Sequence, residues 1–209
     1  MVSLKSQNAP MLCLAAVANG GLLYFFAQNM EIGSADIFSS LTMWQDGTPA
    51  AVLATLIVGA LNLLLPRPLK EALVYWRWSY AAPGFRAFSV HARRDPRVNL
   101  DRLKAHLPEL KGRYLSPELE NKLWYRLYKQ CEAVRAVSQA HRAWLLYRDL
   151  TGLSYLFLGA DLFLWFIGKP TADLRPYLSI GLAELLLFTL AARNAGIQFV
   201  RNVLATSSI

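Results

Sequence analysis

Four long apolar stretches divide the chain, and they constrain what it can fold into more than any other feature. They cover residues 9–28, 49–65, 150–168 and 176–192. A helix crosses the hydrocarbon layer of a bilayer with ~20 mostly apolar residues, within a range of roughly 17 to 25. The sequence therefore predicts an all-α integral membrane protein with four transmembrane helices.

The composition agrees with this prediction. The 209-residue chain is 55% hydrophobic and only 17% charged, whereas about a quarter of the residues of a soluble domain carry a charge. A cleaved signal peptide is the alternative for the first stretch, because residues 16–18 have the small-x-small form of a cleavage site. We favour a membrane span, since the apolar run continues well beyond residue 18 and Lys5 is the one basic residue before it.

Basic residues gather between the second and third stretches. Residues 67–148 contain 17 Lys and Arg against 7 Asp and Glu, whereas residues 29–48 contain no Lys or Arg. Cytoplasmic loops carry an excess of Lys and Arg. We therefore expect this segment and both termini to be cytoplasmic, in the plasma membrane (the inner membrane) of a bacterium. The predicted organisation is two spans in residues 1–66, a cytoplasmic helical domain in residues 67–149, and two spans with a short tail in residues 150–209.

An aromatic and basic group follows the second stretch, at Trp76, Arg77, Trp78 and Tyr80. Such residues favour the headgroup layer, where the rings lie at the boundary and the cations meet anionic lipid. Two interpretations remain open, an anchor at the membrane interface and a short helix packed on its neighbours.

Five Lys and Arg residues lie close together between residues 93 and 104. They fit a nucleic-acid site or a solvated basic face. We favour the solvated face, because the sequence contains no recognised RNA-binding or DNA-binding module.

The last part of the basic segment has the pattern of a long helix. Ser116 suits the N-cap and Pro117 the first helical position, and residues 118–151 contain no Gly or Pro. We therefore expect one continuous helix over about residues 117–168, a stalk that runs straight into the third span. The apolar stripe of such a stalk must be covered, either by residues 70–106 or by the same helix in another subunit. A single stalk with so little beside it buries the stripe poorly, which favours a homo-oligomer, and a cytosolic protein partner is also compatible with it. The stripe that should make these stalk contacts comprises Leu123, Leu127, Cys131, Val134 and Trp144.

Motifs that carry chemistry are missing from the sequence. It contains no G-x-S-x-G, Walker, G-x-G-x-x-G or H-E-x-x-H pattern. The three histidines form no metal-ligand pattern, and Cys13 and Cys131 suggest neither a disulfide framework nor a zinc site. We therefore expect a protein that is not an enzyme and that needs no cofactor or metal.

Two acids interrupt the last two apolar stretches, Asp161 in the third and Glu184 in the fourth. If these spans end near residues 168 and 176, the acids lie ~10 and ~12 Å below the ends at 1.5 Å per residue, and so at nearly one depth. Asn19 in the first stretch lies near mid-depth too. A carboxylate at mid-bilayer costs at least ~2.5–3.5 kcal/mol, so these acids should face the protein interior or water.

Three interpretations of the acids are open. A protonated acid could hydrogen-bond to Asn19 or to a carbonyl and hold helices together. The acids could instead form the polar, water-accessible lining of an oligomeric channel. The third interpretation is a proton or cation relay in a transporter, which four spans without an internal repeat support least.

The layout resembles the small multi-span proteins encoded beside bacterial immune genes, such as transmembrane effectors of CRISPR and cyclic-oligonucleotide defence systems. The resemblance covers architecture only and carries over no residue. It implies a cytosolic part that receives a signal and spans that damage or permeabilise the membrane. We therefore expect an oligomeric, channel-like effector with a cytosolic sensing or partner-binding stalk. The alternative is a non-catalytic accessory or anchoring subunit of a larger complex, and a proton-coupled or cation-coupled transporter is a weaker alternative.

Overall fold

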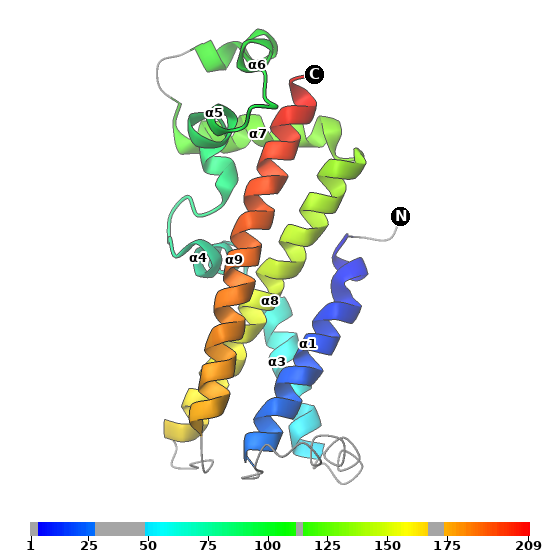
Figure 1. Cartoon of the computed structure of the whole chain (residues 1–209), viewed down its shortest axis with the longest axis vertical. Coiled ribbons are helices and arrows are strands. Elements are labelled where there is room, and N and C mark those ends of the chain that lie inside the picture. The colour runs from blue at the N-terminus through cyan, green and yellow to red at the C-terminus, as the bar shows by residue number, and fades with distance from the viewer. Residues whose placement is uncertain (1–3, 28–48, 112–114, 167–173) are drawn as a thin grey trace. The chain divides into compact units, whose positions relative to one another are not determined.

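A computed structural model describes residues 4–27, 49–111, 115–166 and 174–209 (Figure 1). All regular structure within these residues is helical, which confirms the predicted all-α class. The chain forms two compact units. The first, here the four-helix unit, comprises Met1–Pro66 and Asp149–Phe188, and the second, here the basic unit, comprises Arg67–Arg148 and Thr189–Ile209.

The four predicted spans coincide with helical segments of the four-helix unit. These are α1 (Leu4–Ala27), α3 (Pro49–Leu64), the later part of α8 (Arg135–Phe166) and the earlier part of α9 (Leu174–Ser207). Within the described residues, Tyr177–Ser207 is the one helix both long and apolar enough to cross a membrane, and Thr55–Leu64 is a shorter apolar helix. These two findings are compatible with membrane association. Most of the two predicted outer loops, residues 29–48 and 169–175, lies outside the described residues.

Close approaches join the four helices into a closed ring. On α1, a Cβ added to Gly20 would lie 2.0 Å from Thr55 Oγ1 on α3. On α8, a Cβ added to Gly152 would lie 2.7 Å from Asn62 Oδ1, also on α3. The lack of a side chain at these two glycines is therefore what lets polar side chains of α3 reach α1 and α8. Gly181 makes a similar approach to Leu158 between α9 and α8, and a hydrogen bond described below joins α9 back to α1.

Burial in the four-helix unit is inverted relative to a protein folded in water. Its interior has an apolar layer of Ala16, Val58, Leu153 and Phe157, but it also buries many polar side chains. The buried polar residues are Asn8, Asn19, Thr55, Asn62, Asp149, Thr151, Ser154 and Asp161. The exposed large apolar residues are Met11, Leu14, Val17, Leu56, Ile57, Leu61, Leu63, Leu64, Leu162, Phe163, Phe166, Ile180, Leu182, Leu186 and Leu187.

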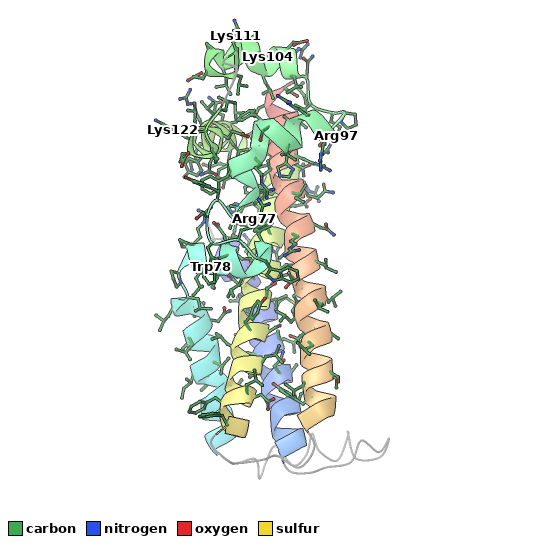
Figure 2. All side chains as sticks on the ribbon, turned by 90° about the vertical axis from the view of Figure 1, so that its left-hand side faces the viewer. Arg77, Trp78, Arg97, Lys104, Lys111 and Lys122 are labelled. Atoms are coloured by element: carbon green, nitrogen blue, oxygen red, sulfur yellow. The ribbon has the colours of Figure 1, made fainter. Side chains whose placement is uncertain are left out.

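The basic unit has a conventional apolar core. Its fully buried side chains include Val74, Leu103, Leu123, Val137 and Val203. Arg97, Lys104, Lys111 and Lys122, labelled in Figure 2, are exposed on its surface. Besides parts of α8 and α9, its elements are α4 (Arg67–Tyr75), η2 (Pro83–Arg86), η3 (Ala87–His91), α5 (Ala92–Arg94), α6 (Leu100–His106), η4 (Pro108–Lys111) and α7 (Pro117–Cys131).

The predicted continuous stalk helix is wrong, because the chain turns between α7 and α8. A straight helix would separate Tyr128 from His141, 13 residues later, by ~20 Å at 1.5 Å per residue. The Tyr128 hydroxyl instead lies 3.0 Å from His141 Nδ1. Both rings pack on Phe199 of α9, at centroid distances of 5.2 and 4.5 Å. Packing on one distant aromatic residue thus bends a segment that contains no local helix breaker, and Figure 1 shows α7 and α8 as separate helices.

The start of α7 agrees with the sequence. Ser116 is the N-cap, its hydroxyl accepts a hydrogen bond from the Leu119 amide at 3.3 Å, and Pro117 follows. The local capping signal was therefore sufficient to predict where this helix begins, but the sequence did not predict where it ends.

Candidate functional site

A polar network centred on Glu184 joins three helices of the four-helix unit. Asn19 Nδ2 on α1 donates to Glu184 Oε1 on α9 at 3.0 Å, and the Ser154 hydroxyl on α8 donates to the same oxygen at 2.9 Å. Asn19 Nδ2 also lies 3.0 Å from the carbonyl oxygen of Ala15. Asn19 and Ser154 are buried, and Glu184 is partly buried. This arrangement matches the first interpretation of the acids, in which one of them is hydrogen-bonded to Asn19.

The two acids do not lie at one depth, contrary to the sequence-based expectation. Glu184 lies opposite Ser154, and Gly181 lies opposite Leu158. Asp161 is seven residues beyond Ser154 on α8, which is ~10 Å along the helix. The expectation failed because it took residues 168 and 176 as helix ends at equal depth, whereas α9 begins at Leu174 and the described part of α8 ends at Phe166.

Asp161 is buried without a hydrogen bond. Its side chain is 1% exposed, and neither carboxyl oxygen has a hydrogen-bond partner among the described residues. The buried Tyr177 at the start of α9 lies within electrostatic reach of it. Since a buried polar group without a partner is costly, the burial of Asp161 destabilises the fold among the described residues.

Sequence reasoning missed Ser154 and the contact made by Asn62. Asn62 Nδ2 donates to the carbonyl oxygen of Asp149 at 3.0 Å, which ties α3 to α8. Ser154 could have been found from its spacing, because it precedes Asp161 by seven residues and so lies on the same face of α8. The contact between Asn62 and Gly152 depends on the pairing of α3 with α8, which no local pattern gives.

The residues of the predicted interface anchor are exposed and lie in the basic unit. Trp76, Trp78 and Tyr80 are 61%, 86% and 45% exposed, and Arg77 is exposed as well (Figure 2). They follow the end of α4, and Trp76 and Tyr80 have positive φ values of 53° and 52°, a conformation uncommon in residues other than glycine.

Two contacts hold this loop. The Arg193 guanidinium lies 4.1 Å from the centre of the Trp76 ring, and the Tyr80 hydroxyl donates to the Glu118 carboxylate. The high exposure of Trp78 argues against the second interpretation, in which this segment is a short helix packed on its neighbours. The loop therefore presents aromatic and basic side chains outward on a fixed backbone.

The predicted stalk contacts are satisfied inside one chain. Leu123, Leu127, Cys131 and Trp144 are buried in the basic unit, whereas Val134 lies in the turn after α7 and is 40% exposed. The stripe is therefore covered within the chain, and it no longer favours a homo-oligomer. The stripe packs beside an aromatic cluster made of Trp124, Tyr128, His141, Trp144 and Phe199.

Two histidines of the basic unit are held neutral. Burial, with the cations Arg148 and Arg67 nearby, lowers the pKa of His141 to about 4. Burial also lowers the pKa of His91 to about 4, with Arg201, Arg86 and Arg94 acting in the same direction. Within the described residues, no group of three or more His, Cys, Asp and Glu side chains could hold a metal ion.

No protein family, no curated protein and no solved structure matches the chain. Function is therefore inferred from the physical chemistry of the two units alone.

Proposed function

We propose that the chain is an integral protein of a bacterial inner membrane, in which four spans anchor a basic helical domain on the cytoplasmic side. The inverted burial of the four-helix unit carries this proposal. In water, the many exposed Leu, Ile, Met and Phe side chains of this unit would carry a free-energy cost of ~25 cal/mol per Å² of apolar surface. Lipid removes that cost and requires polar groups to be bonded inside, as Asn19, Ser154 and Glu184 are.

An anchoring role suits the placement of the polar residues better than a pore on an oligomer axis. A pore shared between subunits needs its polar lining on the outer surface of each subunit. Asn19 and Ser154 are instead buried inside one chain and hold Glu184 there. Hydrogen bonds between membrane helices contribute ~0.6 kcal/mol each on average, which is enough for several of them to stabilise helix pairing. The basic unit has its own core and supplies the surface for a cytosolic partner.

A topology experiment tests the anchoring proposal. Four spans with cytoplasmic termini predict that a fluorescent protein fused after Ile209 fluoresces and that alkaline phosphatase fused there is inactive. In a chain whose native cysteines are replaced by serine, a cysteine at position 34 should react with an impermeant maleimide added to spheroplasts. A cysteine at position 138 should react only after lysis. Extraction of the chain by alkaline carbonate, or an active phosphatase at the C-terminus, would contradict the proposal.

Asp161 favours a second candidate, an oligomeric channel-like effector of the kind that acts in antiviral defence, in which the path runs inside the four-helix unit of each subunit, where Asp161 is buried. A buried, ionisable residue inside a span is by default a functional-site hypothesis, and no hydrogen-bond partner among the described residues explains Asp161. In cells carrying a membrane-potential dye, expression of the chain should then cause depolarisation. Asp161→Asn should abolish depolarisation, and Ser179→Ala, a polar change elsewhere in the same unit, should not. Unchanged potential under expression and under phage infection would exclude this candidate.

A further inference from the structure

The loop formed by residues 76–80, here the aromatic loop, is exposed at every position. It comes directly after α4 and reads Trp-Arg-Trp-Ser-Tyr. Three of its five side chains are aromatic, and Trp78, labelled in Figure 2, is 86% exposed. Exposed apolar groups that lie together mark an interaction site, whereas rings scattered singly over a surface do not. The aromatic loop is therefore a candidate interaction surface.

The backbone of the aromatic loop is strained at both ends. Trp76 and Tyr80 have φ values of 53° and 52°, in a region that bulky side chains rarely occupy. Such conformations persist only where the surrounding structure holds them, and they gather at functional sites. The two strained residues lie on either side of Arg77 and Trp78, so the strain fixes the backbone that presents these two side chains.

Contacts within the basic unit hold both strained residues. The Nε atom of Arg193 on α9 donates to the carbonyl oxygen of Val74 at 2.7 Å, and the same guanidinium lies 4.1 Å from the centre of the Trp76 ring. At the other end, the Tyr80 ring lies 5.3 Å from the Phe85 ring, in addition to the hydroxyl contact described above. The aromatic loop is therefore held at its two ends while its middle is left exposed.

The basic unit carries far more positive than negative charge. Residues 67–148 contain 17 Lys and Arg and 7 Asp and Glu, and residues 189–209 add two Arg and no acid. All seven acids are already engaged: Glu71, Asp95, Asp101, Glu109 and Glu132 pair with Lys or Arg, Glu118 accepts from Tyr80, and Glu120 accepts from backbone amides. Arg77 is exposed and forms no ion pair among the described residues. A partner of the aromatic loop should therefore be anionic.

We infer that the aromatic loop binds the headgroups of anionic phospholipids. Tryptophan and tyrosine rings favour the boundary between lipid and water, and a Lys or Arg residue beside an anionic membrane surface is attracted to it. The exposed rings and the unpaired guanidinium of Arg77 match these two properties together. The inference rests on the proposed function, because it requires that α3 crosses a membrane.

The chain itself keeps the aromatic loop close to that membrane. Trp76 follows Pro66 by ten residues, and nine of these residues form α4. A nine-residue helix is ~13.5 Å long, and the step between consecutive Cα atoms is ~3.8 Å. The aromatic loop is therefore tethered within ~20 Å of the end of the second predicted span.

A fluorescent probe beside Trp78 tests the inference. In the full chain carrying Cys13→Ser and Cys131→Ala, Ser79→Cys provides an exposed attachment site for the probe. The labelled chain is placed in nanodiscs of phosphatidylcholine that contain increasing fractions of phosphatidylglycerol. A small, constant fraction of the lipid is spin-labelled at the headgroup, so that it quenches a probe that reaches the interface. We expect quenching to rise with the fraction of phosphatidylglycerol.

Two arginines provide a matched pair of variants. Arg77 and Arg135 are both exposed and form no ion pair among the described residues, but Arg135 lies at the start of α8, outside the aromatic loop. Arg77→Gln should lower the ratio of quenched to unquenched probe roughly fivefold, the effect of one cation at an anionic surface. Arg135→Gln removes the same charge and should leave the ratio unchanged. Because both side chains are exposed, both variants should keep the melting temperature of the parent chain.

The outcomes separate this inference from the proposed function. Quenching that does not depend on phosphatidylglycerol would overturn the inference, as would an equal loss in Arg77→Gln and Arg135→Gln. A probe that is unquenched in every nanodisc would also overturn it and would point to a soluble acidic partner. In each of these cases the spans are intact if the chain resists extraction from membranes by alkaline carbonate. Extraction by carbonate contradicts the proposed function itself.

Discussion

Acidification should destabilise the basic unit through His91 and His141. Both have a folded-state pKa of about 4, whereas an unfolded histidine titrates near ~6.5. Between these values the unfolded chain binds more protons than the folded chain, so stability falls as pH falls. The loss begins near the unfolded pKa and is complete below the folded one.

The size of the effect follows from the two pKa values. The difference between a folded-state pKa of about 4 and an unfolded pKa of ~6.5 corresponds to a maximum of ~3 kcal/mol for each histidine. Between about pH 7.5 and about pH 5 the free energy of unfolding should fall by ~2 kcal/mol for each histidine, or ~4 kcal/mol for both. This is a large fraction of the ~5–15 kcal/mol that stabilises a typical domain. Asp95, whose pKa is lowered by its hydrogen bonds from Arg97, titrates at lower pH and adds little in this interval.

Urea unfolding of the full chain in detergent, followed by tryptophan fluorescence, measures the effect at the two pH values. His141→Phe keeps the stacking on Phe199 and removes the titrating group. It should lower stability at neutral pH by ~1 kcal/mol, through loss of the hydrogen bond with Tyr128, and should halve the pH dependence. A pH dependence unchanged in His141→Phe, or a wild-type chain more stable at pH 5, would refute this reasoning.

Three further predictions concern packing and exposure. Gly152→Ala should destabilise the four-helix unit by ~1–3 kcal/mol in thermal unfolding, because its methyl group would clash with Asn62 Oδ1, and Asn62→Ala in the same chain should relieve part of the loss. Leu127→Ala should cost ~2–5 kcal/mol in urea unfolding because Leu127 is buried, whereas Val134→Ala should stay within ~0.5 kcal/mol because Val134 is exposed at the turn. Lipids spin-labelled at the headgroup quench tryptophan fluorescence at the membrane interface. Trp78→Ala should remove much of this quenching, because Trp78 is exposed, whereas Trp124→Phe should leave it unchanged, because Trp124 is buried.

The sequence predicted those features that depend on local composition. Apolar runs placed the helical segments of the four-helix unit, and Ser116 with Pro117 placed the start of α7. The end of α7 could not be predicted, because the turn depends on Phe199, which lies far along the chain from Tyr128 and His141.

The candidate polar network was predicted in part. Asn19 and Glu184 each stood out as polar residues near mid-depth, and a depth argument was enough to suggest their contact. The expectation that Asp161 lies level with Glu184 was wrong, because the two antiparallel helices pair seven residues away from that register and bring Ser154 opposite Glu184. Composition places a residue roughly along the membrane normal, but only side-chain packing, as between Leu158 and Gly181, fixes the register.

The different surroundings of the two acids lead to opposite predictions for their replacement by apolar residues. Glu184→Met should destabilise the four-helix unit by ~1 kcal/mol or more, because it removes the acceptor of two hydrogen bonds. Asp161→Val should stabilise it by ~1–3 kcal/mol, because it removes a buried carboxyl group that has no hydrogen-bond partner among the described residues. Unfolding of both variants in mixed micelles measures the difference. A residue kept at a cost in stability is expected where function needs it, so a stabilised but inactive Asp161→Val would support a functional role for Asp161. A destabilised Asp161→Val would show instead that this carboxyl group contributes to the fold as Glu184 does.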